Sequence, residues 1–326
     1  SIDAVLVEVE ARAFGPRSLG EGARALASDE LARVLALDPT HPRALAARAY
    51  VRLTRDRVGL VTSSRAERRA SVDDAELALR LDPAQPLAHA ALAELASASG
   101  NRHEAQAAST RAVELAPHVA ELFLLRGRLR ARLGDAGALE DFDAALRLRP
   151  YDARAHTNRA ALLLAKGKVA LARHAAGEAL GVDSTLPEAY FQRGLSFYKA
   201  TPRQLQEAVN DLSRAISLDA GFADASFYRA CVLHDARMYP EALADLDRAE
   251  LARAERGSFH LREAYLLRGH CLFRLRRWSD ARAAYDVYVL RAPPGSVPTK
   301  VADRLALLSS LLAGQVDEKT IDVDNY

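Results

Sequence analysis

Residues 79–96 read LRLDPAQPLAHAALAELA, and the position of their prolines decides the fold. A run of helix-forming residues ends at Asp82-Pro83, and a second run begins three residues later at Pro86. Proline breaks the interior of a helix but is well tolerated at its first position. The stretch therefore predicts two helices joined by a tight turn. The alanines after Pro86 predict that the second helix lies close to a neighbour.

The same kind of ending recurs along the chain at a nearly constant interval. From Pro83 onward the endings at Pro117, Pro150, Ser184 and Ala220 are separated by 34, 33, 34 and 36 residues. Fixed periods of this size are typical of a stack of repeated structural units.

Each unit has the pattern of two helices. In residues 153–184, apolar residues recur at helical spacing on either side of Gly167, which can supply the positive φ of a turn. Asp152 is a candidate N-cap for the first helix. Thr185–Glu188 and Thr201–Gln204 have the spacing of capping boxes, with Pro202 expected at a first helical position. The unit is therefore a predicted helical hairpin.

These units resemble the tetratricopeptide repeat (TPR), a helix pair with small residues at positions 8, 20 and 27 and an aromatic residue at position 24. Seven units align, at residues 42–83, 86–117, 120–150, 153–184, 187–220, 223–252 and 262–293. Position 8 is Ala49, Ala93, Gly127, Ala160, Gly194, Ala230 and Gly269. Position 20 is Ser71, Ala105, Ala138, Ala172, Ala208, Ala242 and Ala281. Position 27 is Ala78, Ala112, Ala145, Ala179, Ala215, Ala249 and, as a misfit, Tyr288, while position 24 is aromatic at Phe142 and Tyr285.

Small side chains at these positions let the two helices of a unit approach, and a larger one would cost about 1–3 kcal/mol. The resemblance implies an all-α fold, a right-handed superhelical α-solenoid of stacked helix-turn-helix repeats. Around the array at 40–293 we expect a degenerate N-terminal helix pair at 1–39, with GPRSLGEG as its turn. We also expect a capping helix at 294–314 and a flexible acidic tail at 315–326. A sharper alternative is that this tail folds back into the basic part of the groove and occludes it.

Composition limits the class of protein. Hydrophobic residues make up 49% and charged residues 27% of the 326 residues, with a net charge of +2 spread in both signs, so neither a membrane span nor a nucleic-acid surface is expected. The opening SIDAVLVEVE has no basic region and no starting Met, so we expect no signal peptide and a fragment or trimmed product. Two cysteines cannot form a disulfide framework, which favours a cytoplasmic location, and we expect a bacterial source.

No motif predicts catalysis. Gly167-Lys168 lacks the other residues of a phosphate-binding loop, and His103-Glu104 lacks the second histidine of a zinc-protease helix because position 107 is Ala. The histidines have no ligand spacing, so no metal and no cofactor are expected. Cys231 and Cys271 are interpreted as small hydrophobic residues. We therefore expect a protein that is not an enzyme.

The resemblance also implies where a partner would bind, because TPR arrays present their first helices to a concave groove. Carried onto this sequence, the groove positions predict a peptide- or protein-binding set: Arg128, Arg132, Asn158, Phe191, Tyr198, Lys199, Phe227, His234, His270, Phe273 and Arg274, together with Asp235. Aromatic side chains supply contact area and arginine binds carboxylates through paired N–H groups. The alternative for Phe191, Phe227 and Phe273 is that their rings pack against the next unit.

These observations favour a non-catalytic scaffold that binds a peptide or partner segment, from a separate protein or from another domain of the same polypeptide. The alternative is a regulatory or sensor TPR segment of a larger signalling enzyme, such as a bacterial Ser/Thr kinase. RNA binding by a helical-hairpin array is favoured least, because it needs a basic face. A chaperone-tail clamp is also disfavoured, because no unit has the required lysine and asparagine pair.

Overall fold

The computed structural model describes residues 2, 6–9, 21–53, 63–256, 261–293 and 295–323. Within these ranges every regular element is a helix, which confirms the all-α prediction. The α-helices are α2 (Glu21–Leu37), α3 (Pro42–Arg52), α4 (Arg65–Leu81), α5 (Pro86–Ala98), α6 (Arg102–Leu115), α7 (Ala120–Arg132), α8 (Ala138–Leu148), α9 (Ala153–Ala165), α10 (Val169–Val182), α11 (Pro187–Tyr198), α12 (Leu205–Leu218), α13 (Ala223–Asp235), α14 (Tyr239–Arg256), α15 (Leu261–Arg274), α16 (Trp278–Leu290) and α17 (Thr299–Leu312). A short 3₁₀ helix, η1 (Glu318–Thr320), follows.

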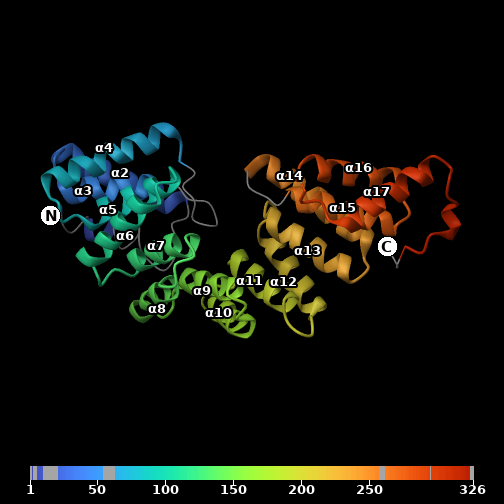
Figure 1. Cartoon of the computed structure of the whole chain (residues 1–326). Coiled ribbons are helices and arrows are strands. Elements are labelled where there is room, and N and C mark those ends of the chain that lie inside the picture. Colours follow the sequence, from blue (N-terminus) through green and yellow to red (C-terminus); the bar gives the residue numbers. More distant parts are fainter. Residues whose placement is uncertain are drawn as a thin grey trace. The chain divides into compact units, whose positions relative to one another are not determined.

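The chain forms two compact bodies. The N-terminal body comprises Ser1–Lys166 with Gly181–Ser184, and the C-terminal body comprises Gly167–Leu180 with Thr185–Tyr326. Within each body, consecutive helices pack as hairpins and each hairpin packs on the next, as Figure 1 shows for α5 to α8 and for α11 to α16. Both bodies are therefore stacks of helix pairs.

Each of the seven aligned units contains two helices, from α3 and α4 in the first to α15 and α16 in the seventh. The residues at positions 8, 20 and 27 are buried in all seven units, including the misfit Tyr288. The predicted turn and helix start in residues 79–96 are also present, because α4 ends at Leu81 with Asp82 as its C-cap and α5 begins at Pro86. The spacing of small residues therefore predicted the packing of the repeats.

The residues at positions 8 and 24 of one repeat are matched in size. A Cβ atom added to Gly127 would lie 2.7 Å from Cε1 of Phe142, and one added to Gly269 would lie 2.5 Å from Cε1 of Tyr285. In the sixth repeat (residues 223–252), positions 8 and 24 are Ala230 and Leu246. A ring at position 24 therefore requires glycine at position 8, because the ring lies directly on the first helix.

Helix caps were predicted only in part. Asp152 is confirmed as the N-cap of α9, because its Oδ1 accepts hydrogen bonds from two backbone N–H groups at 3.0 and 3.1 Å. Gly167 has φ +71°, as its turn requires. Among the described helices, the reciprocal capping box lies at Ser64 and Glu67, before α4.

The two predicted capping boxes are wrong. α11 begins at Pro187 with Leu186 as its N-cap, so Thr185 lies outside the helix. α12 begins at Leu205 with Gln204 as its N-cap, and Pro202 lies in the loop before it. This loop is closed by the backbone N–H of Gln204, which donates to the carbonyl of Phe197 at 3.1 Å, and the extra loop residues displace the helix start.

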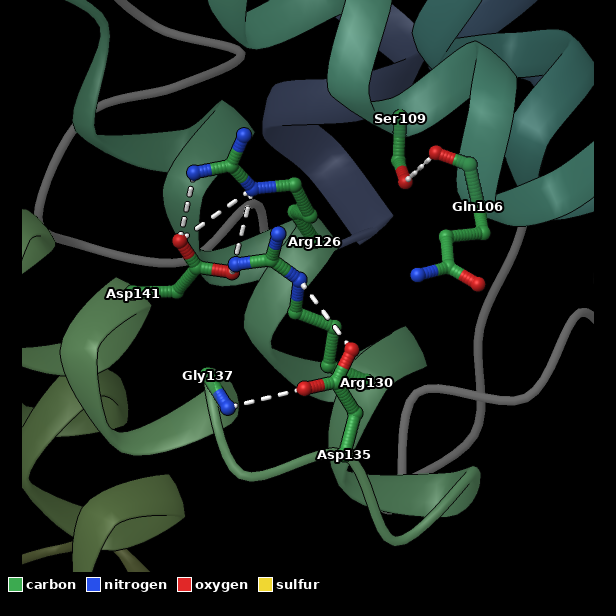
Figure 2. Close-up of polar contacts among 7 residues, drawn as sticks. All are labelled: Gln106, Ser109, Arg126, Arg130, Asp135, Gly137 and Asp141. Carbon is green, nitrogen blue, oxygen red and sulfur yellow. Dashed lines mark hydrogen bonds and ion pairs between the residues drawn. The ribbon is translucent and has the colours of Figure 1, made fainter.

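A recurrent ion pair joins the two helices of several repeats. In Figure 2, Asp141 on α8 lies between Arg126 and Arg130 of α7, with N–O distances of 2.6 and 2.9 Å. Equivalent pairs are Arg48–Asp74 at 2.8 Å, Arg193–Asp211 at 2.7 Å and Arg229–Asp245 at 2.6 Å. In each case the arginine is at position 7 and the aspartate comes three residues after position 20.

Helices outside the seven units cover the ends of the bodies. On α17, Val301 and Leu308 are buried in the core of the last repeat, and Arg304 donates to the hydroxyl of Tyr285 at 3.1 Å. In the N-terminal body, residues 6–9 are helical, and Leu6 and Val9 are buried in the same core cluster as Leu31 of α2. The greater part of the turn predicted at GPRSLGEG lies outside the described residues.

Candidate functional site

First helices of the C-terminal body bring four polar residues into a row. Helix α11 neighbours α13, and α13 neighbours α15. The hydroxyl of Tyr198 on α11 donates to Oδ2 of Asp235 at 2.8 Å, and Nδ1 of His234 lies 3.3 Å from Oδ1 of the same carboxylate. The rings of His234 and His270 on α15 are 6.1 Å apart. We call Tyr198, His234, Asp235 and His270 the polar row.

One end of the polar row is bordered by cations. Arg203 pairs with Asp235, and its guanidinium lies 4.9 Å from the centre of the Tyr198 ring. Lys199 is exposed beside them. A hollow of about 430 Å³ opens at this end, lined by Tyr198, Lys199, Ala200, Thr201, Pro202 and Arg203. Acidic groups of a ligand would meet positive charge here.

Burial sets the protonation of the row. Desolvation lowers the pKa of His270 to about 3, and the positive charges of Arg304 and Arg274 and the neighbouring His234 act in the same direction. Burial also raises the pKa of Tyr198, with the hydrogen bond to Asp235 as the second cause. At neutral pH the row therefore contains a neutral imidazole at His270 and a protonated phenol, which are hydrogen-bonding groups rather than charges.

The predicted aromatic residues pack within the body. Phe273 has no exposed surface; its ring lies edge-on to Trp278 with centroids 5.3 Å apart, and Arg304 lies 5.2 Å above it. Phe227 is 7% exposed, and the half-buried Phe191 lies 5.0 Å from Phe222. In this structure the rings of Phe227 and Phe273 are core, and they are not presented to a partner.

A segment of the same chain contacts the last predicted groove residue. The guanidinium of Arg274, at the end of α15, donates to the carbonyl of Val323. Arg274 therefore already binds a backbone carbonyl of the chain itself.

In the N-terminal body, Arg128 of α7 is bound by carboxylates of the chain itself. It lies 2.9 Å from Glu94, which is almost fully buried on α5, and 4.0 Å from Glu121. Arg132 is exposed and donates to Ser97 Oγ at 3.4 Å, while Asn158 is half-buried on α9. These three residues belong to the N-terminal body, where Arg128 and Arg132 already have polar contacts.

Comparison with known proteins agrees with this geometry. A family model described as tetratricopeptide repeat matches residues 252–297, which include α15 and α16. The chain carries tetratricopeptide repeats.

Solved structures extend the agreement to most of the chain. The TPR array matches a chain of the APC/C hetero-tetramer Cut9-Hcn1 with a TM-score of 0.69 at 12% identity, over 94% of this chain. It covers 55% of the Cut9-Hcn1 chain, so it spans about half of that length. A tetratricopeptide repeat protein from Parabacteroides merdae matches with a TM-score of 0.54 at 18% identity, over 75% of this chain and 93% of its own. No curated protein matches the sequence. At these identities the likeness shows the fold.

The TPR array also contains two thiols. Cys231 and Cys271 are free, and burial raises the pKa of each thiol to about 12. Among the described residues, no group of three potential metal-binding side chains comes together. In the same part of the chain, none of the helices combines the length and apolar character of a membrane span.

Sequence reasoning missed Arg203 and four position-7 arginines, Arg48, Arg126, Arg193 and Arg229. Arg203 lies in a loop, outside the helical positions to which the TPR pattern assigns a role. The repeated Arg and Asp spacing was a readable signal, because an arginine at position 7 and an aspartate three residues after position 20 occur together in four repeats.

Proposed function

We propose that this chain is a non-catalytic scaffold whose C-terminal body binds a peptide segment of a partner protein along its first helices. TPR arrays are protein-interaction folds, because stacked helix pairs leave an extended face formed by one helix of each pair. The polar row supports the proposal, because it joins α11, α13 and α15 and meets exposed cations at one end.

The chemistry of the row favours a partner with acidic and hydrogen-bonding groups. Lys199 and Arg203 would pair with carboxylates, with arginine able to bind both oxygens at once. The phenol of Tyr198 and the imidazole of His270 supply neutral hydrogen-bonding groups farther along. The partner is a protein rather than a nucleic acid, because positive charge is confined to one end of the row. The free, protonated cysteines support a cytoplasmic location.

Site-specific photo-crosslinking tests this face. A photo-reactive amino acid at Lys199 is expected to crosslink a partner peptide or protein, and one at Leu171, exposed on α10, is expected to give little product. To test the two cations, the photo-reactive amino acid is placed at Asp235 instead of Lys199. Replacement of Lys199 and Arg203 by Glu is expected to abolish the crosslink formed there, because it reverses both positive charges.

The matched control is a chain with Lys168→Glu and Arg214→Glu, which makes the same change in net charge at exposed positions away from the row. This control is expected to keep the crosslink, and circular dichroism is expected to show unchanged helix content in both variants. Equal crosslinking at Leu171, or equal loss in both charge-reversal variants, would contradict binding on the first helices.

A further inference from the structure

Residues 317–323 lie against the end of α15 and comprise the short 3₁₀ helix η1 (Glu318–Thr320) followed by Ile321, Asp322 and Val323. Arg276, in the turn after α15, donates from Nη1 to the carbonyl of Glu318 at 3.1 Å and from Nη2 to the carbonyl of Ile321 at 3.3 Å. Arg274 donates to the carbonyl of Val323. Two arginines thus hold three carbonyls of one segment, and backbone carbonyls are groups that any peptide presents.

After η1, the side chains of residues 321–323 alternate between the body and solvent. Ile321 is 5% exposed, Asp322 is exposed, and Val323 packs against the core cluster that contains Phe273. Main-chain hydrogen bonds together with pockets for alternate side chains are one way in which peptides are recognised.

We propose that Arg274 and Arg276 form a binding corner for an acidic peptide of a partner protein, and that residues 317–323 are its resident, displaceable ligand. The partner segment carries β-branched apolar residues two positions apart, as Ile321 and Val323 are. Acidic residues flank them in the partner segment, as Asp317, Glu318 and Asp322 do in residues 317–323. The corner lies on the last first helix, so binding there requires the chain's own segment to leave. The binding corner rests on the proposed function, because both assume that a partner protein binds the C-terminal body. The experiment that tests the corner uses a synthetic peptide and needs no partner protein.

The probe is a fluorescent synthetic peptide with the sequence of residues 315–323, QVDEKTIDV, added to the full chain and followed by fluorescence anisotropy. In the unaltered chain the resident segment competes at an effective concentration of about millimolar. Ile321→Asp in the chain is expected to release that segment and to increase peptide affinity about tenfold or more, because burying an isoleucine side chain is strongly favourable. A peptide that itself carries Asp in place of Ile321 is expected not to bind.

Matched variants separate the corner from general effects. In the Ile321→Asp chain, Arg276→Ala is expected to abolish peptide binding, whereas Arg277→Ala, at the exposed next position, is expected to retain it. Leu312→Asp adds the same charge at a half-exposed position on α17 and is expected to leave affinity at the level of the unaltered chain. If Ile321→Asp binds the peptide no better than the unaltered chain, the corner is only a structural cap and the proposal fails.

A second measurement needs no substitution in the chain. Millimolar unlabelled peptide is expected to accelerate hydrogen exchange at the amides of residues 317–323 in the unaltered chain, because it displaces them. Unchanged exchange at saturating peptide would also overturn the proposal, even if Ile321→Asp were to unfold the last repeat. Crosslinking at Lys199 does not enter either measurement, so failure here and failure of the proposed face are distinguishable.

Discussion

Replacing Gly269 by Ala would place a methyl group at the contact between α15 and α16. Its Cβ would lie 2.5, 2.6 and 3.0 Å from Cε1, Cδ1 and Cζ of Tyr285, all shorter than a van der Waals contact. The ring cannot move away easily, because it is fully buried and its hydroxyl is bonded to Arg304 on α17. Overpacking of a close-packed core costs about 1–3 kcal/mol, and the shortness of these contacts favours the upper end. Gly→Ala in a helix interior returns about 0.5–1 kcal/mol, so we expect a net loss of about 2 kcal/mol.

Two control variants test whether the contact with Tyr285 causes the loss of stability. Gly177 lies inside α10 with no heavy atom within 4 Å of an added Cβ, so Gly177→Ala is expected to stabilise the fold by about 0.5–1 kcal/mol. The double variant Gly269→Ala with Tyr285→Leu recreates the pair Ala230 and Leu246 of repeat 6, which is buried in this fold. It is therefore expected to be more stable than the sum of the two single changes predicts, because the leucine removes the clash.

The assay must report on the last repeat, because long repeat arrays do not unfold as one two-state unit. Trp278, the single tryptophan, begins α16, so its fluorescence during urea unfolding follows this repeat. Native-state hydrogen exchange at the amides of α15 and α16 gives the local opening free energy. If Gly269→Ala stabilises the repeat as Gly177→Ala does, the size matching between positions 8 and 24 is refuted.

Three further outcomes are expected. Arg193→Leu alone is expected to destabilise its repeat by about 3 kcal/mol in urea unfolding, because it leaves the buried Asp211 carboxylate without its arginine. The double variant Arg193→Leu with Asp211→Ala is expected to recover most of this loss. His270 has a folded-state pKa of about 3, below its unfolded value near 6.5. Between these two pH values the unfolded chain binds a proton that the folded chain does not bind. The free energy of unfolding is therefore expected to fall as pH decreases through this window, by at most about 1.4 kcal/mol per pH unit. The slope is expected to be smaller in His270→Gln and unchanged in His174→Gln, whose side chain is exposed. Cys271 is expected to react with iodoacetamide at pH 8 only after unfolding, because burial keeps it a thiol, and rapid labelling of the folded chain would contradict this.

Much of the fold was predictable because contact between helices restricts side-chain size at fixed positions. Ala208 and Ala242, for example, are buried where α12 and α14 meet their partner helices, and no larger residue would fit without displacement. Such a restriction recurs with the period of the repeat, so a single sequence contains several independent copies of the signal. Asp152 and Gly167 were predictable for a similar reason, since each satisfies a local backbone requirement.

The site was less predictable because its contacts depend on which neighbour a side chain reaches. Phe273 and Tyr198 occupy equivalent kinds of position on first helices, yet one is in the core and the other reaches Asp235 on the next first helix. Arg203 reaches the same carboxylate from a loop whose length no helical pattern specifies. Arginines at position 7 also differ in the residue that they contact. In the repeat of Arg159, the place three residues after position 20 is Ala175, and Arg159 pairs with Asp143 of the preceding helix at 2.8 Å.

The charge pairing within each body explains why we place partner binding in the C-terminal body. In the N-terminal body, the carboxylate that holds Arg128 belongs to Glu94, which is 1% exposed. A partner that took this arginine would leave that carboxylate buried and unpaired, at a cost of about 3–5 kcal/mol. In the C-terminal body, Lys199 is exposed, and Arg203 pairs with a carboxylate that Tyr198 and His234 also contact. A ligand carboxylate can therefore approach these cations without leaving the Asp235 carboxylate unpaired. Binding here therefore has a lower desolvation cost than binding at Arg128.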